Sequence, residues 1–250
     1  MQVIVNSLIT HYDKQGSANK CILLLHGWGD TRKTFRQLQK DLAQEYTVIS
    51  VDLPGFGDTQ VPHEAWDLDE YANFIRAFLQ KIGIAKLYAV VGHSNGCALA
   101  LRSISTKKIM PQRLILIAAS GIRNRGSVRK FAIKIAAKTG KVALFWLPQK
   151  YRNVLQKKMY GVVGSDMLVV PHMQETFKKT VQQDVQAAAA TVTAKTLLLY
   201  GDNDKATPVE FGRIYQKIIK DATLEVMNTA HFIHHEEPEL IYKKIKEFLC

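Results

Sequence analysis

The sequence predicts an α/β protein: a mostly parallel, twisted sheet flanked by helices, with a helical segment inserted after the sixth strand. Short strand-like runs recur through the first half of the chain, and a helical pattern of apolar residues separates the later ones. Strands that alternate with helices favour a parallel sheet. The alternation stops after Ala119 and resumes at Thr196, so the residues in between form the insertion.

The elements follow from local patterns. Apolar residues from Tyr71 to Ile82 recur at three- and four-residue steps, which indicates a helix with one buried face. A second helix closes at Ile219, and Pro238 begins a terminal helix at a position where proline is tolerated. The expected strands, in chain order, are residues 3–5, 8–12, 21–26, 47–51, 87–91, 114–119, 196–200 and 223–227.

Composition narrows the class of protein. With 250 residues and 47% hydrophobic content, the chain suits a large α/β domain with a sizeable core. The longest apolar runs are far shorter than the roughly 20 residues that a membrane span needs. Three scattered cysteines argue against a disulfide framework, and the N-terminal residues lack the pattern of a secretory signal. We therefore expect a cytoplasmic protein with reduced thiols.

The positive charge belongs to one segment. The formal net charge is +12, and residues 121–190 hold 13 Lys and Arg against three Asp and Glu. The first helix of the insertion is expected to carry a lysine face formed by Lys130, Lys134, Lys138 and Lys141. We interpret this face as solvated, and docking on an anionic lipid surface is the alternative. No recognised nucleic-acid module accompanies the charge, so we expect no nucleic-acid partner.

Ser94 lies in the pattern G-H-S-N-G, residues 92–96. A strand-like run precedes the pattern and a helical run follows it, the context in which a serine sits exposed on a tight strand-to-helix turn. The alternative is an ordinary glycine-rich turn. As a nucleophile, the serine needs a base to take its proton.

A histidine and an acid should complete such a site. His231 follows the last expected strand, which places it at the carboxyl edge of a parallel sheet. Asp202 and Asp204 both follow the strand before it, and either one could orient the imidazole while the other caps the turn. His93 adjoins Ser94, but neighbours on a sharp turn point apart, so we interpret His93 as a packing or supporting residue.

The order Ser94, Asp204, His231 resembles the α/β-hydrolase family, and four further patterns agree with it. These are H-G-W-G-D from His26, D-L-P-G-F-G from Asp52, G-x-x-D from Gly201 and H-x-x-x-x-E-x-P from His231. The resemblance implies that Asp204 is the acid. It also implies that the backbone N–H groups of Trp28 and Asn95 form an oxyanion hole.

The chain departs from the family pattern at three positions. Asn95 replaces the common methionine or glutamine, Ala230 the usual glycine, and Thr59 the usual serine. None of these removes a catalytic group. The resemblance implies three parts: residues 1–120 and 192–250 as the hydrolase core, and residues 121–191 as a helical cap over the nucleophile. Candidate substrate-binding residues are Phe131, Trp146, Tyr160 and Phe232.

The function that the resemblance implies is cofactor-free cleavage of carboxylic esters of small to medium acyl chains through an acyl-enzyme. A serine nucleophile excludes the chemistry of relatives that attack with aspartate. A monoacylglycerol-type lipase, a thioesterase, a carbon–carbon bond hydrolase and a perhydrolase remain alternatives, as does a slow-turnover receptor on the same fold. The sequence leaves the oligomeric state open.

The histidines near the C-terminus raise the question of a metal. His231, His234, His235 and Glu236 lie close together in the sequence, but their spacing fits the usual zinc motifs poorly. Because Pro238 marks the expected helix start, we expect these residues to lie in an irregular loop with no metal bound.

Overall fold

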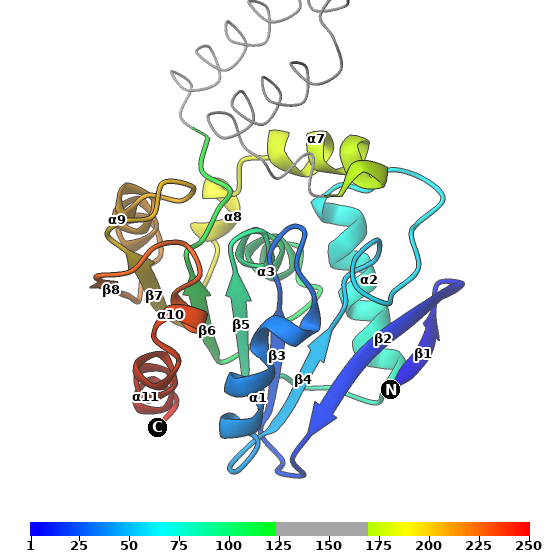
Figure 1. Cartoon of the computed structure of the whole chain (residues 1–250), viewed down its shortest axis with the longest axis horizontal. Coiled ribbons are helices and arrows are strands. Elements are labelled where there is room, and N and C mark those ends of the chain that lie inside the picture. Colours follow the sequence, from blue (N-terminus) through cyan, green and yellow to red (C-terminus); the bar gives the residue numbers. More distant parts are fainter. Residues whose placement is uncertain (124–169) are drawn as a thin grey trace, which may run out of the picture.

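An eight-stranded sheet forms the centre of the molecule, as the computed structural model of residues 1–123 and 170–250 describes it (Figure 1). The strand order is β1-β2-β4-β3-β5-β6-β7-β8. β1 and β2 pair antiparallel, β2 pairs antiparallel with β4, and all the remaining pairs are parallel. The strands are β1 (Gln2–Val5), β2 (Leu8–Gln15), β3 (Cys21–Leu25), β4 (Thr47–Val51), β5 (Ala89–His93), β6 (Arg113–Ile117), β7 (Lys195–Gly201) and β8 (Ala222–Met227).

Helices cover both faces of this sheet. The described helices are η1 (Arg32–Phe35), α1 (Arg36–Leu42), α2 (Leu68–Lys81), α3 (Asn95–Ser105), η3 (Pro171–Met173), α7 (Gln174–Gln182), α8 (Gln186–Ala189), α9 (Val209–Ile218), α10 (Ile233–Glu236) and α11 (Pro238–Leu249). Alternate residues of β3 face two different clusters: Leu23 and Leu25 pack with α2, α3 and α9, whereas Ile22 and Leu24 pack with α1 and α11.

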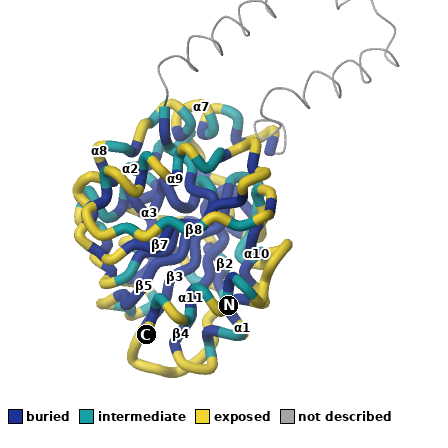
Figure 2. The backbone as a smooth tube through the Cα atoms, turned by 90° about the vertical axis from the view of Figure 1, so that its left-hand side faces the viewer, coloured by how far each residue is buried: buried dark blue, intermediate teal, exposed yellow. Residues whose placement is uncertain are grey.

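The central strands are apolar because both of their faces are buried. Every residue of β3, β4 and β5 is buried, which accounts for near-continuous apolar runs in place of an alternating pattern. Figure 2 shows the buried central strands inside the molecule and the exposed segments around them. The eight expected strands are all present. The expected extension of β6 to residue 119 is wrong, because Ala118 has a left-handed φ of 48° and ends the strand at Ile117.

Helix α2 matches the periodicity expected for it. Its buried face includes Tyr71, Phe74 and Phe78. The helix begins with a capping box in which the Asp67 carboxylate accepts the backbone N–H of Glu70, and the Glu70 carboxylate accepts that of Asp67. These reciprocal bonds satisfy two backbone N–H groups that the first turn leaves without helical partners.

Part of the expected insertion lies among the described residues. Helix α7 lies at the carboxyl-end edge of the sheet (Figure 1), and α8 packs against α3 and α9. The Val185 N–H donates to the Gly121 carbonyl at 2.9 Å, so the two ends of the segment meet. The lysine face and the expected cap helix fall within residues 124–169, outside the described residues, and the domain boundaries remain a prediction. No described helix is long and apolar enough to cross a membrane.

The expectation of an irregular loop before Pro238 is wrong. Ile233–Glu236 form the single turn α10, in which the Glu236 N–H donates to the Phe232 carbonyl at 3.0 Å. The residue before a proline is disfavoured in the helical conformation, and Glu237 is accordingly not helical, with φ −133° and ψ 60°. Proline therefore separates two helices here and does not prevent the first.

Candidate active site

Ser94 occupies a strained turn between β5 and α3. Its φ is 51° and its ψ is −113°, a conformation that residues other than glycine rarely adopt. The flanking glycines make the turn possible: a Cβ on Gly96 would lie 2.1 Å from the Leu25 carbonyl oxygen, and one on Gly92 would lie 2.8 Å from the Cys97 nitrogen. The turn therefore holds Ser94, partly exposed, at the carboxyl end of β5.

Asp204 and His231 meet across the ends of β7 and β8. The Nδ1 atom of His231 lies 2.7 Å from Oδ2 of Asp204. Since a carboxylate only accepts, Nδ1 carries the proton and Nε2 keeps its lone pair. Gly201 allows the two loops to approach, because a Cβ there would lie 2.3 Å from the Thr229 carbonyl oxygen. The structure thus brings two of the three predicted catalytic side chains into contact.

The Asp204 carboxylate accepts four hydrogen bonds. Oδ1 accepts the backbone N–H groups of Ala206 at 2.7 Å and Thr207 at 3.0 Å, while Oδ2 accepts the Thr207 hydroxyl at 2.7 Å in addition to His231. Burial alone would raise the pKa of Asp204, but the bonds from His231 and Thr207 outweigh it, and the pKa lies below its usual value. Asp204 is therefore ionised at neutral pH.

Asp202 has a different environment. It is exposed, and its Oδ1 accepts a hydrogen bond from its neighbour Asn203 at 2.8 Å. The residues alone left the choice between the two aspartates open, and the contact with His231 belongs to Asp204. The supporting contact of Thr207 was missed, because no pattern in the sequence indicated that its hydroxyl would reach the carboxylate.

His93 supports the residue proposed as the base. Its Nε2 donates to the backbone carbonyl of His231 at 3.1 Å, and the two rings lie 4.9 Å apart between centroids. Burial, followed by the neighbouring His234 and His231, places the pKa of His93 well below its usual value, so the ring is neutral. This position agrees with the interpretation of His93 as a supporting residue.

In the described part of the chain, no hydrogen bond joins Ser94 Oγ with His231 Nε2. Such contacts between nucleophile and base are commonly loose without substrate and tighten in the bound complex. Both side chains are partly exposed, which leaves the serine hydroxyl room to turn.

The residues expected to form an oxyanion hole follow β3 and Ser94. Asn95 is the first residue of α3, where the backbone N–H has no acceptor within the helix. Trp28 packs with ring centroids 4.9 Å from Phe56 and 5.0 Å from Phe177 of α7. Neither aromatic partner was predicted. Both contacts join segments that lie apart in the sequence, and Phe177 belongs to α7. The role of both N–H groups remains a prediction.

A buried charge network holds the loop that carries Trp28. The Asp52 side chain is fully buried and accepts the Arg32 backbone N–H at 2.6 Å, and it also forms an ion pair with the Arg32 guanidinium. His26 Nε2 accepts the Leu53 N–H at 3.0 Å. Two of the sequence patterns, H-G-W-G-D and D-L-P-G-F-G, therefore contact each other at the end of β3.

Of the expected substrate-binding residues, only Phe232 lies among the described ones. It is 46% exposed, and its ring centroid lies 5.4 Å from that of His231. Phe131, Trp146 and Tyr160 fall outside the described residues. Phe232 therefore presents an apolar surface next to the proposed base.

Comparisons with known proteins identify the family and the fold. Residues 22–244 match the model of the alpha/beta hydrolase family. The uncharacterized hydrolase YugF of Bacillus subtilis strain 168 is 22% identical over 264 residues, which cover 98% of this chain and 94% of that protein.

Two solved structures are similar in fold. A membrane phospholipase A described as a bacterial virulence factor aligns with a TM-score of 0.76 at 23% identity, covering all of this chain and 84% of that one. The meta-cleavage product hydrolase of Pseudomonas fluorescens IP01 aligns with a TM-score of 0.74 at 19% identity, covering 99% and 96%. At this identity the two likenesses show the fold alone. Since the family model matches most of its length, the chain belongs to the alpha/beta hydrolase family.

Proposed function

We propose that this hydrolase cleaves carboxylic esters of small to medium acyl chains by a Ser94–His231–Asp204 mechanism. The observation that carries the proposal is the pairing of the strained turn at Ser94 with the 2.7 Å contact between His231 Nδ1 and Asp204 Oδ2. A backbone conformation that costs free energy persists where function uses it. An imidazole whose Nδ1 proton is held by a carboxylate has Nε2 free to act as a base.

In the proposed reaction, Ser94 Oγ attacks the ester carbonyl carbon while His231 Nε2 takes the hydroxyl proton. The buried Asp204 carboxylate stabilises the imidazolium that forms. The N–H groups of Trp28 and Asn95 stabilise the negative oxygen, and each such donor typically contributes about 3 kcal/mol. His231 then returns its proton to the leaving alcohol, and water repeats the sequence on the acyl-enzyme.

A labelling experiment tests the nucleophile. A fluorophosphonate probe should label the wild type and leave Ser94→Ala unlabelled, because among the described serines only Ser94 is expected to have both a base and an oxyanion hole. Ser105→Ala is the matched control: Ser105 lies on the helix that follows, and its hydroxyl donates locally to the Arg102 carbonyl at 2.9 Å. Full labelling of Ser94→Ala would refute the assignment.

A substrate screen tests the reaction class. Esters of increasing acyl length, a thioester, a monoacylglycerol and a β-diketone would be compared by steady-state turnover. Highest kcat/KM on short to medium esters supports the proposal, whereas preference for another bond would assign the enzyme to one of the alternatives. A burst without sustained turnover of an activated ester would point to a receptor.

A further inference from the structure

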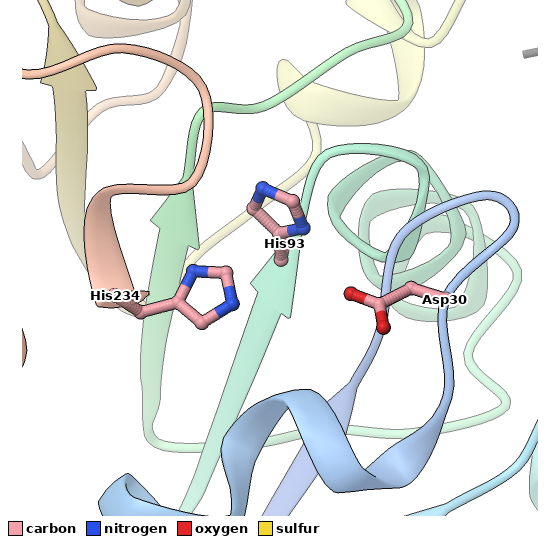
Figure 3. A group of neighbouring side chains, drawn as sticks. All are labelled: Asp30, His93 and His234. Carbon is pink, nitrogen blue, oxygen red and sulfur yellow. The ribbon is translucent and has the colours of Figure 1, made fainter. Parts of the chain in front are cut away.

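Three buried polar atoms without hydrogen-bond partners lie behind the proposed active site. They are Oδ2 of Asp30, Nδ1 of His93 and Nδ1 of His234. The three residues come from the loop after β3, the end of β5 and α10, and one ring nitrogen of each histidine and one carboxylate oxygen of Asp30 lie within 4.8 Å of one another. Figure 3 shows the two imidazoles and the carboxylate around a shared space. Buried polar atoms are rarely left unpaired, so we expect an ion or a water molecule between these three side chains.

The hydrogen bonds around His93 determine what that occupant must supply. The Nε2 atom of His93 faces the His231 carbonyl oxygen at 3.1 Å. A carbonyl can only accept, so Nε2 carries the proton and Nδ1 presents a lone pair to the shared space. Oδ2 of Asp30 likewise presents lone pairs, while Oδ1 accepts the Thr31 N–H at 2.7 Å.

His234 can present a lone pair as well. Its Nε2 lies 3.0 Å from Thr34 Oγ1, which also lies 2.7 Å from His235 Nε2. When His234 Nε2 donates to Thr34 and Thr34 donates to His235, Nδ1 of His234 is free to bind.

A cation fits this set of atoms better than a neutral molecule. Each neutral imidazole keeps one lone pair, so three acceptors converge when those lone pairs face the shared space, and a water molecule has only two protons to donate. No lysine or arginine forms an ion pair with Asp30 in the described part of the chain. Metal-binding histidines almost always donate their second ring N–H to a backbone carbonyl, a carboxylate or a similar acceptor, as His93 does here and as His234 can do.

We propose that Asp30, His93 and His234 bind a divalent transition-metal ion such as Zn²⁺. Two imidazole nitrogens and one carboxylate suit zinc or cobalt, whereas magnesium and calcium prefer oxygen ligands alone. Ligands about 2.1 Å from one ion stand no more than about 4.2 Å apart, so the side chains close slightly on binding. Asp30 is only partly buried and can provide this movement.

The site would stabilise the loop that carries the proposed base. His93 would bind the metal through Nδ1 while its Nε2–H holds the His231 carbonyl, so the ion connects that loop to the end of β5. No step of ester cleavage uses the ion. This site differs from the cluster considered in the sequence, because only His234 of that cluster takes part.

Metal binding to the full chain, without a histidine tag and after treatment with chelator, tests the proposal. Zn²⁺ stoichiometry would be measured by mass spectrometry after gel filtration, affinity by calorimetry, and Co²⁺ ligation by visible absorption. We expect one Zn²⁺ per chain, and a melting temperature about 2 °C or more higher with saturating Zn²⁺ but unchanged with Mg²⁺.

Variants locate the site. His234→Gln and Asp30→Asn should each weaken Zn²⁺ binding at least about tenfold and abolish the Co²⁺ absorption. His63→Gln is the matched control, because it removes an exposed imidazole that lies outside the cluster, and it should bind Zn²⁺ normally. Circular dichroism checks the fold of each variant, and either ligand variant alone suffices if the other unfolds. The absence of stoichiometric binding, unchanged binding in the folded ligand variants, or equal loss in His63→Gln would overturn the proposal.

Discussion

Replacing Asp204 by asparagine gives a strict test of the proposed catalytic arrangement. The carboxylate has two oxygens, and each accepts two hydrogen bonds: Oδ1 from two backbone N–H groups, and Oδ2 from the Thr207 hydroxyl and His231 Nδ1. An asparagine has one oxygen. With that oxygen toward the backbone amides, its NH₂ group faces His231 and requires an unprotonated Nδ1. The proton then sits on Nε2, which can no longer accept one from Ser94.

The expected loss is large in rate and moderate in stability. In a serine enzyme of another fold, the equivalent change of tautomer lowers kcat about 10⁴-fold, which corresponds to about 5 kcal/mol in the barrier. Two hydrogen bonds to a charged acceptor are also lost, and each contributes about 1.5–3 kcal/mol to stability. Part of this loss is offset because the asparagine is cheaper to bury than an ionised carboxylate.

Asp202→Asn is the matched control. Asp202 is exposed, so the free energy of unfolding should change by no more than about 0.5 kcal/mol, and kcat should stay near that of the wild type. The assay is hydrolysis of an activated short-chain ester, with urea unfolding measured in parallel on all three proteins. If Asp202→Asn is the inactive variant, or if Asp204→Asn keeps more than about a tenth of wild-type kcat, the tautomer argument is wrong.

Three further predictions rest on burial and charge. Gly96→Ala should lower the free energy of unfolding in urea by about 3 kcal/mol or prevent folding, because its Cβ would overlap the carbonyl oxygen of β3; a change below about 0.5 kcal/mol would contradict this. Iodoacetamide at pH 8 should alkylate the exposed Cys250 and spare Cys21, whose pKa burial raises to about 11, as peptide mass spectrometry would show. The pKa of Asp204 is lower in the folded chain than in the unfolded chain, so its ionised form stabilises the fold above about pH 4. The difference in unfolding free energy between wild type and Asp204→Asn should therefore shrink as the pH falls below 4, and a constant difference would contradict the shift.

The sheet and the turn at Ser94 could be predicted because their signals are local. Buried parallel strands are continuous apolar runs. The close approach of α3 to β3 requires Gly96, and the tight turn from β5 into α3 requires Gly92. No local signal in the sequence distinguishes Asp204 from Asp202. Both follow the same strand, and only the path of the turn, which buries one carboxylate and exposes the other, separates them. The resemblance to a family supplied what the residues alone did not.

The contacts around the site could not be predicted because they join distant segments. Phe177 reaches Trp28 from α7, and Thr207 reaches Asp204 through a turn whose shape the sequence does not specify. The cluster of Asp30, His93 and His234 was the hardest feature to predict. Its members lie in three separate sequence patterns, and each pattern is explained by the hydrolase fold without a metal.

His93 takes part both in the turn at Ser94 and in the cluster with Asp30 and His234. It precedes Ser94 on the strained turn, and its side chain lies against the backbone of His231. The turn at Ser94 thus places the His93 imidazole so that Nε2 contacts the loop of the proposed base, His231, and Nδ1 faces Asp30 and His234. A substitution at His93 would change both contacts together, so its effect on activity alone could not separate them. The variants at His234 and Asp30 can, because neither residue hydrogen-bonds to His231 in the described part of the chain.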